Sequence, residues 1–184
     1  IFRKPLPALV HNAGLPILLP SFIERILHMA TSVIEQKLTA LGLEFPTLPA
    51  SKGIYKSCVT QGNLVYVSGH VSLNTDGTFI TGKLGKDLDE EQGQAAARQC
   101  GLAMLASLSK HLGNLDHVKG VVKLLGMVNA TPDYEKHPVV INGCSALFAE
   151  LWGEEHGIGV RSAVGMGSLP GNVAVEIEGI FELV

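Results

Sequence analysis

The sequence has 184 residues, of which 46% are hydrophobic and 17% charged, a composition typical of one globular domain and not of a disordered chain. A formal net charge of −3, without any run of lysine or arginine, argues against a surface for nucleic acid or for an anionic membrane. The cysteines are few, far apart and outside any CxxC motif, which predicts buried thiols in a reducing compartment. They are Cys58, Cys100 and Cys144.

The first 28 residues differ from the rest of the chain. They contain four prolines and a single acidic residue, Glu24, and their apolar runs are too short and too interrupted by proline to span a bilayer. We interpret residues 1–28 as an N-terminal extension, either transit-like or foreign to the natural protein, and residues 29–184 as one domain. The expected location is the cytoplasm, with the mitochondrion as the alternative.

A helix and a hairpin are predicted at the start of the domain. Ser32 is a typical N-cap, and Glu35 follows three residues later, as in a capping box. Residues 57–62 and 64–72 predict two strands joined at a Gly-Asn turn. In the second strand, alternation assigns Val65, Val67 and Val71 to one face and Leu64, Tyr66, Ser68 and His70 to the other.

Two long helices and a strand are predicted next. Asp89 is expected to cap the longest helix, and Gly113 is expected to end it. Residues 118–130 form a nearly unbroken apolar run, which predicts a strand covered on both faces. A third helix is expected to begin at Pro138, because proline fits the first turn of a helix.

Residues 160–178 carry the most unusual pattern. Two strands are predicted to pair as a hairpin through the turn at residues 170–171. In this register Arg161 and Glu176 share a face with glycines and alanines, and their backbones lie roughly 13 Å apart. Small residues let a ligand approach the backbone, so the guanidinium and the carboxylate would face a small molecule between them. The simpler alternative is a surface ion pair, which contributes little.

The element order ββαβαββ after the first helix predicts an α+β fold, a mixed sheet with two long helices on one face. The opposite face of the sheet is expected to be too apolar and too rich in small residues for exposure to water, so we expect other subunits to bury it. Its predicted residues are Leu64, Tyr66, Ala163, Gly165, Ala174 and Ile180.

Several short motifs resemble the YjgF/RidA family, which is also called endoribonuclease L-PSP. They are Tyr55, residues 60–64 (TQGNL), 67–70 (VSGH), 118–119 (VK), 161–162 (RS), 169–170 (LP) and 175–178 (VEIE). The resemblance covers about residues 45–184, arguably from Met29, and is nearest to a longer YjgF-like branch. It implies a chorismate-mutase-like α+β fold that assembles as a homotrimer, with ligand sites between subunits.

The resemblance also implies an activity, the hydrolysis of reactive enamines and imines such as 2-aminoacrylate to a 2-keto acid and ammonia. Arg161 corresponds to the arginine that binds the substrate carboxylate, and Glu176 to the carboxylate that positions or activates water. Tyr55 and Ser68 correspond to residues that orient the ligand or the water. The implied ligand-binding positions are Gly69, through its backbone N–H, His70, Asn142 and Ala163.

Among the departures from the family pattern, two concern candidate site residues. Ala163 stands where a cysteine is common, which argues against a thiol mechanism. His70 stands where glutamine is common, and a lone strand histidine is more often a surface or packing residue than a catalytic base.

Two other functions stay open. One is a non-catalytic trimer that binds small carboxylates or a protein partner, and the other is the ribonuclease of the family's label, which the acidic balance disfavours. No metal or cofactor is expected, because the histidines are scattered and no HExxH motif or paired Cys/His spacing occurs.

Overall fold

The computed structural model describes residues 32–50 and 53–184, which lie in one compact unit, Thr31–Val184. The extension predicted over residues 1–28 lies outside the described residues. The elements are α2 (Val33–Ala40), β1 (Cys58–Gln61), β2 (Leu64–Val71), α3 (Glu90–Leu112), η1 (Leu115–His117), β3 (Val118–Asn129), α4 (His137–Gly157), β4 (Val160–Met166), η2 (Pro170–Asn172) and β5 (Val175–Leu183). None of the described helices is both long enough and apolar enough to cross a membrane.

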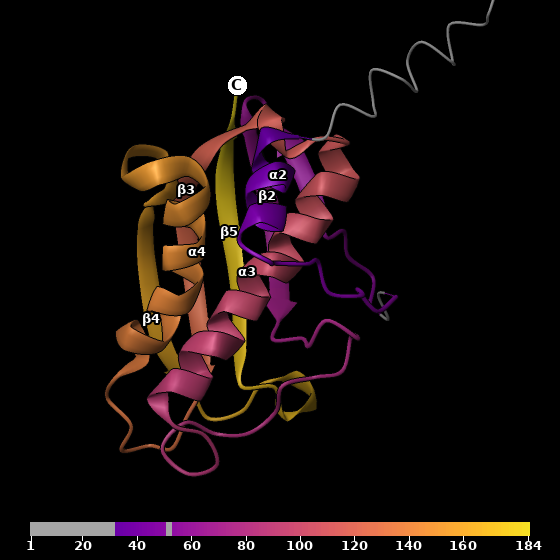
Figure 1. Ribbon diagram of the computed structural model, residues 1–184. Coiled ribbons are helices and arrows are strands. Elements are labelled where there is room, and N and C mark those ends of the chain that lie inside the picture. The colour runs from indigo at the N-terminus through magenta and orange to yellow at the C-terminus, as the bar shows by residue number, and fades with distance from the viewer. Residues whose placement is uncertain (1–31, 51–52) are drawn as a thin grey trace, which may run out of the picture. The chain divides into compact units, whose positions relative to one another are not determined.

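The five strands form one mixed sheet in the order β1-β2-β5-β3-β4 (Figure 1). All neighbouring strands are antiparallel except β3 and β4, which are parallel and are joined by α4. Helices α3 and α4 both cover one face of the sheet, which we call the helix face (Figure 1). We call the opposite face the open face. The predicted α+β fold, with two long helices on one face of a mixed sheet, is confirmed.

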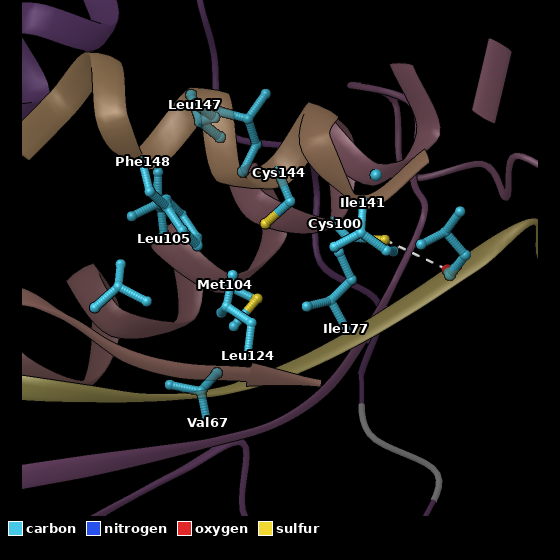
Figure 2. Packing of buried hydrophobic residues seen from close by; sticks show 14 of the residues in the cluster. Val67, Cys100, Met104, Leu105, Leu124, Ile141, Cys144, Leu147, Phe148 and Ile177 are labelled. Atoms are coloured by element: carbon cyan, nitrogen blue, oxygen red, sulfur yellow. Dashed lines mark hydrogen bonds between the residues drawn. The ribbon is translucent and has the colours of Figure 1, made fainter. Parts of the chain in front are cut away.

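The core fills the space between the two long helices and the helix face of the sheet (Figure 2). One side of α3 is buried, and so is one side of α4, because apolar residues recur there every three or four positions. Fully buried on α4 are Val140, Ile141, Cys144, Leu147, Phe148 and Leu151. The three cysteines are buried and free, as predicted, and burial raises the pKa of Cys58 to about 11 and that of Cys144 to about 12.

Local signals define the helix starts as predicted. Ser32 caps α2 by accepting hydrogen bonds from the next turn, and Asp89 forms a capping box with Gln92 at the start of α3. Gly113 ends α3 in the left-handed conformation that glycine favours. Pro138 lies in the first turn of α4, one residue after the helix begins.

The last two strands do not form the predicted hairpin. Strand β3 lies between them, so that Leu124 of β3 pairs with Arg161 of β4 on one side and with Gly179 of β5 on the other. Residues 167–174 therefore cross the end of β3. The prediction was wrong because a Pro-Gly pair marks a change of direction without determining which strands pair.

Asn129, at the end of β3, holds this crossing together. Its side chain is fully buried, and its amide nitrogen lies 3.3 Å from the Gly82 carbonyl, 3.1 Å from Asn172 Oδ1 and 3.1 Å from the Val173 carbonyl. Its backbone N–H donates to the Ala174 carbonyl at 2.9 Å. One residue thus joins the loop before α3 to the segment that leads into β5.

Two predicted strand faces also need correction. The register of β2 shifts between Val67 and His70, so His70 faces the helices and Val71 faces the open side, the reverse of the prediction. Strand β3 is covered on one face only, because Val122 and Lys123 on its other side are exposed. A continuous apolar run therefore did not indicate burial on both faces.

The predicted open face is correct in part. Leu64, Tyr66 and Ile180 lie on it, paired across β2 and β5. Ala163 and Gly165 lie instead on the helix face, because their β3 partners, Gly126 and Val128, face the helices. Ala174 is fully buried just before β5 and belongs to neither surface.

Replacing Asn129 by alanine should lower the free energy of unfolding by about 1–3 kcal/mol, because buried carbonyl groups lose their donor. Asn129→Asp should lower the free energy of unfolding further, since it turns a carboxylate oxygen towards three oxygen acceptors. Urea denaturation measures both changes. Asn74→Ala, which removes an exposed turn amide, is the control. A loss for Asn129→Ala no larger than that for Asn74→Ala would contradict this role.

Candidate functional site

Arg161 lies on the edge strand β4 and points to the helix face. Its NH1 nitrogen donates to Ser145 Oγ at 2.9 Å, and its NH2 nitrogen donates to the Pro138 carbonyl at 3.1 Å and to Asn142 Oδ1 at 2.7 Å. All three acceptors belong to α4. The structure thus brings together Arg161 and Asn142, two residues predicted to contact a ligand, while the guanidinium remains partly exposed.

The spacing of the acceptors along α4 explains this arrangement. Positions 138, 142 and 145 recur at three- and four-residue intervals and so line one side of the helix. Because α4 returns the chain from β3 to the parallel strand β4, that side faces the β4 edge. Ser145 was missed from the sequence, where a lone helical serine gives no signal until the strand beside it is known.

A histidine beside strand β4 was also missed. The imidazole of His137, the first residue of α4, lies against Gly165 of β4, where a Cβ atom would collide with His137 Nε2. The ring also packs edge-on against Tyr134, with the ring centroids 5.3 Å apart. Glycine at position 165 therefore makes room for the His137 ring against the strand.

Glu176 lies on the opposite side of the sheet from Arg161. It pairs with Val71 and Met127, and its neighbours Val175 and Ile177 point into the core, so the Glu176 side chain projects from the open face. Its carboxylate covers Gly69, where any Cβ would collide with Glu176 Oε1.

The half-buried carboxyl group of Glu176 is suited to proton transfer. Burial raises its pKa, and the neighbouring charge of Glu178 raises the pKa further. A carboxyl group with a raised pKa exchanges protons more readily near neutral pH than an ordinary glutamate. Nowhere among residues 32–50 and 53–184 does a donor form a hydrogen bond with this carboxylate.

Ser68 and Gly69 form the shifted segment of β2 beside Glu176. Ser68 Oγ is buried and has no hydrogen-bond partner within the described chain. Such a hydroxyl group can bind a ligand or a water molecule. Tyr55 lies in the loop before β1 with 58% of its surface exposed.

The ligand-binding role predicted for His70 is not supported by its position. The ring is buried against α3, with Nδ1 2.7 Å from the Ser68 carbonyl and Nε2 2.7 Å from Ser107 Oγ. Because a carbonyl only accepts, Nδ1 carries the proton and Nε2 of the neutral ring accepts from Ser107. Burial lowers the pKa of His70, against the opposing effect of the bond to Ser68. His70 is a packing residue of the helix face.

The predicted residues therefore form two groups. The Arg161 group (Arg161, Asn142 and Ala163) lies between β4 and α4, and the Glu176 group (Glu176, Ser68 and Gly69) lies on the open face. The prediction that Arg161 and Glu176 share a face is wrong.

A hollow of about 400 Å³ on the open face reaches only one member of these groups, Ser68. Its lining residues are Lys56, Val59, Tyr66, Val67, Ser68, Lys123, Leu125, Glu178, Gly179 and Ile180. Neither Arg161 nor Glu176 lines it, so this hollow does not unite the two groups.

Residues 35–173 match the sequence model of a family described as "YjgF/chorismate_mutase-like, putative endoribonuclease". The chain belongs to the YjgF/RidA family. The resemblance seen in its motifs is thereby confirmed. In this YjgF/RidA chain the described residues contain no group of three His, Cys, Asp or Glu side chains placed to hold a metal ion.

The chain is also similar to one curated protein and to several solved structures. The protein TCP17 of Trypanosoma cruzi is 39% identical over 155 residues, which cover 84% of this chain and 97% of TCP17. The crystal structure of Atu1372 from Agrobacterium tumefaciens, a protein described as of unknown function, is 40% identical, with a TM-score of 0.74 over 83% of this chain and 94% of that one. The structure of RidA from the Antarctic bacterium Psychrobacter is 26% identical, with a TM-score of 0.50 over 74% and 94% of the two chains.

Glu178→Gln should lower the pKa of Glu176, because it removes the negative charge that opposes ionisation of that carboxyl group. Titration of the side-chain carboxyl signals by NMR measures the shift. Glu182→Gln is the matched control, since Glu182 is paired with Lys119. An unchanged or higher pKa in Glu178→Gln would contradict the electrostatic coupling.

The raised pKa of Glu176 also makes the stability of the fold depend on pH. Since the pKa of Glu176 is higher in the folded chain than in the unfolded chain, its stabilising contribution is present at low pH and is lost as the pH rises through the folded value.

Proposed function

We propose that this chain hydrolyses small enamines and imines that carry a carboxylate, at a site formed between two copies in a homotrimer. The separation of the Arg161 and Glu176 groups carries this proposal. Because the two groups lie on opposite faces of one sheet, a small ligand contacts both only if different copies supply them. The proposed copies would meet through the open face.

The exposed residues of the open face support such an assembly. Several large apolar side chains there are exposed to water in the single chain, a pattern typical of a surface that a partner covers. They are Val59, Tyr66, Val122, Val160, Val164 and Met166, each at least 36% exposed. A second copy would remove this apolar area from water and would bring one edge strand near another open face.

Arg161 would hold the substrate carboxylate. A guanidinium is planar, remains charged and matches the geometry of a carboxylate. The next residue on the same face of β4, Ala163, is small, whereas the space over Gly165 is taken by the His137 ring. The alanine at position 163 supplies no thiol, so in this proposal neither a nucleophilic cysteine nor a covalent intermediate takes part.

Glu176 would accept and return protons during the reaction. Attack of water on the imine carbon forms a C–O bond, while one proton of the water passes to the Glu176 carboxylate. The proton is then returned to the nitrogen, which gives a carbinolamine. The same carboxylate takes the proton of the new hydroxyl group and passes it to the nitrogen, the C–N bond breaks, and ammonia leaves as the carbonyl of the 2-keto acid forms. The sum is imine plus water giving keto acid plus ammonia, so Glu176 ends in its starting state.

Ser68, Gly69 and Tyr55 would complete the Glu176 side. The unpartnered Ser68 hydroxyl lies in the same shifted segment of β2 as Gly69, whose missing side chain makes room for the Glu176 carboxylate. Tyr55 would close the site only once a second copy is present, since in one chain its side chain is largely exposed.

The proposal predicts that the chain speeds keto-acid release from 2-aminoacrylate generated by a pyridoxal-phosphate-dependent dehydratase. Arg161→Ala should abolish the acceleration, and Glu176→Gln should lower the turnover number by a factor of about 10² or more. Arg98→Ala is the matched control, because Arg98 is a surface arginine paired with Glu150 outside both groups. Keto-acid formation is followed in a coupled assay, with the folded oligomer verified for each variant.

The same assay separates the alternatives. If the wild type binds carboxylates through Arg161 but does not accelerate keto-acid release, the chain is a binding protein and not an enzyme. RNA binding that weakens steeply with salt would favour the ribonuclease named in the family description.

Gly69→Ala should reduce turnover without unfolding the chain. The added methyl group meets the end of the flexible Glu176 side chain, which can move aside at little cost in stability but then leaves its position. We expect a thermal midpoint close to that of the wild type together with at least a tenfold loss of turnover. Full activity in the folded variant would show that the position of Glu176 does not matter.

A further inference from the structure

The hydrogen bonds of Arg161 leave it without a free pair of adjacent donors. A guanidinium has five N–H groups, one on Nε and two on each terminal nitrogen. Both N–H groups of NH2 are engaged, one by the Pro138 carbonyl and one by Asn142 Oδ1, while NH1 donates to Ser145 Oγ. All the acceptors come from the same helix.

This arrangement matters because a carboxylate binds a guanidinium best through two parallel N–H groups. The two edges available are formed by NH1 with NH2 and by Nε with NH2. NH2 belongs to both edges, and both of its N–H groups are taken. A ligand carboxylate can therefore bind Arg161 through two hydrogen bonds only after one α4 acceptor has left NH2.

The two acceptors on NH2 differ in their freedom to leave. The Pro138 carbonyl is part of the backbone in the first turn of α4 and moves only if the helix moves. Asn142 is an exposed side chain whose amide can rotate about its own bonds. Asn142 is thus the acceptor that a ligand can displace.

We propose that Asn142 is a positioning residue that competes with the ligand carboxylate for Arg161 and turns away when the ligand binds. This inference rests on the proposed function only in taking Arg161 as the carboxylate-binding group. It reverses the role given to Asn142 by the sequence resemblance, in which the amide helps to bind the ligand. The Pro138 and Ser145 acceptors would keep the guanidinium in place after Asn142 has left.

The two roles for Asn142 predict opposite effects of its removal. If Asn142 competes, a ligand that binds Asn142→Ala no longer has to break the hydrogen bond between Arg161 and Asn142. Carboxylates should then bind about two- to tenfold more tightly. If Asn142 contacts the ligand, the same change should weaken binding. Asn142→Asp places a charged competitor beside Arg161 and should weaken binding about tenfold or more.

The experiment is a titration of the full-length folded protein with pyruvate, followed by NMR. It compares the wild type, Asn142→Ala and Asn142→Asp, with Arg161→Ala as the variant that should lose binding and Arg98→Ala as the surface control. Tighter binding to Asn142→Ala, together with weaker binding to Asn142→Asp, supports the proposal. In the imine assay the Asn142→Ala change should appear as a lower KM with little change in kcat.

Equal or weaker binding of pyruvate to Asn142→Ala overturns the proposal, and so does the absence of pyruvate binding to the wild type and to Asn142→Ala alike. The failure of the proposed function is distinguishable from this result. A chain that binds pyruvate as predicted but does not accelerate imine hydrolysis would refute the activity and leave the competition between Asn142 and carboxylates in place.

Discussion

The arrangement of the sheet and of the candidate site depends on the crossing of residues 167–174 over the end of β3. Asn129 holds that crossing by binding Gly82, Asn172 and Val173 through one buried amide. The crossing places β3 between β4 and β5, and the alternation of side chains then determines the face of every residue on the two outer strands. Arg161 consequently meets α4, while Glu176 meets the open side of the sheet.

Most of the fold was predictable because its signals are local. Ser32, Asp89 and Gly113 fix helix ends through hydrogen bonds within one turn, and the apolar periodicity of α3 and α4 predicts their buried sides. The pairing of strands far apart in sequence has no such signal. The Pro-Gly pair at residues 170–171 is compatible with a hairpin and with a crossing loop, and only the long-range contacts of Asn129 distinguish the two.

The candidate site was predictable in its residues more than in its geometry. Motif spacing identified Arg161 and Glu176, but an assumed register placed them together, and β3 separates them. One shifted residue pair in β2 was enough to turn His70 towards the helices. Ser145 could not be identified from the sequence, because its role as an acceptor for Arg161 depends on which strand lies beside α4. In each case the missing information was the partner across the sheet or helix interface, and not the chemistry of the side chain.

Mixing two inactive variants tests most directly whether a site needs Arg161 from one copy and Glu176 from another. Arg161→Ala and Glu176→Gln chains would be unfolded together, refolded as mixed trimers and assayed for imine hydrolysis beside each variant alone. Random mixing should restore about a quarter of the wild-type sites, because some interfaces then receive an intact arginine from one chain and an intact glutamate from its neighbour. No gain over the separate variants, in trimers shown to be mixed, would contradict a shared site.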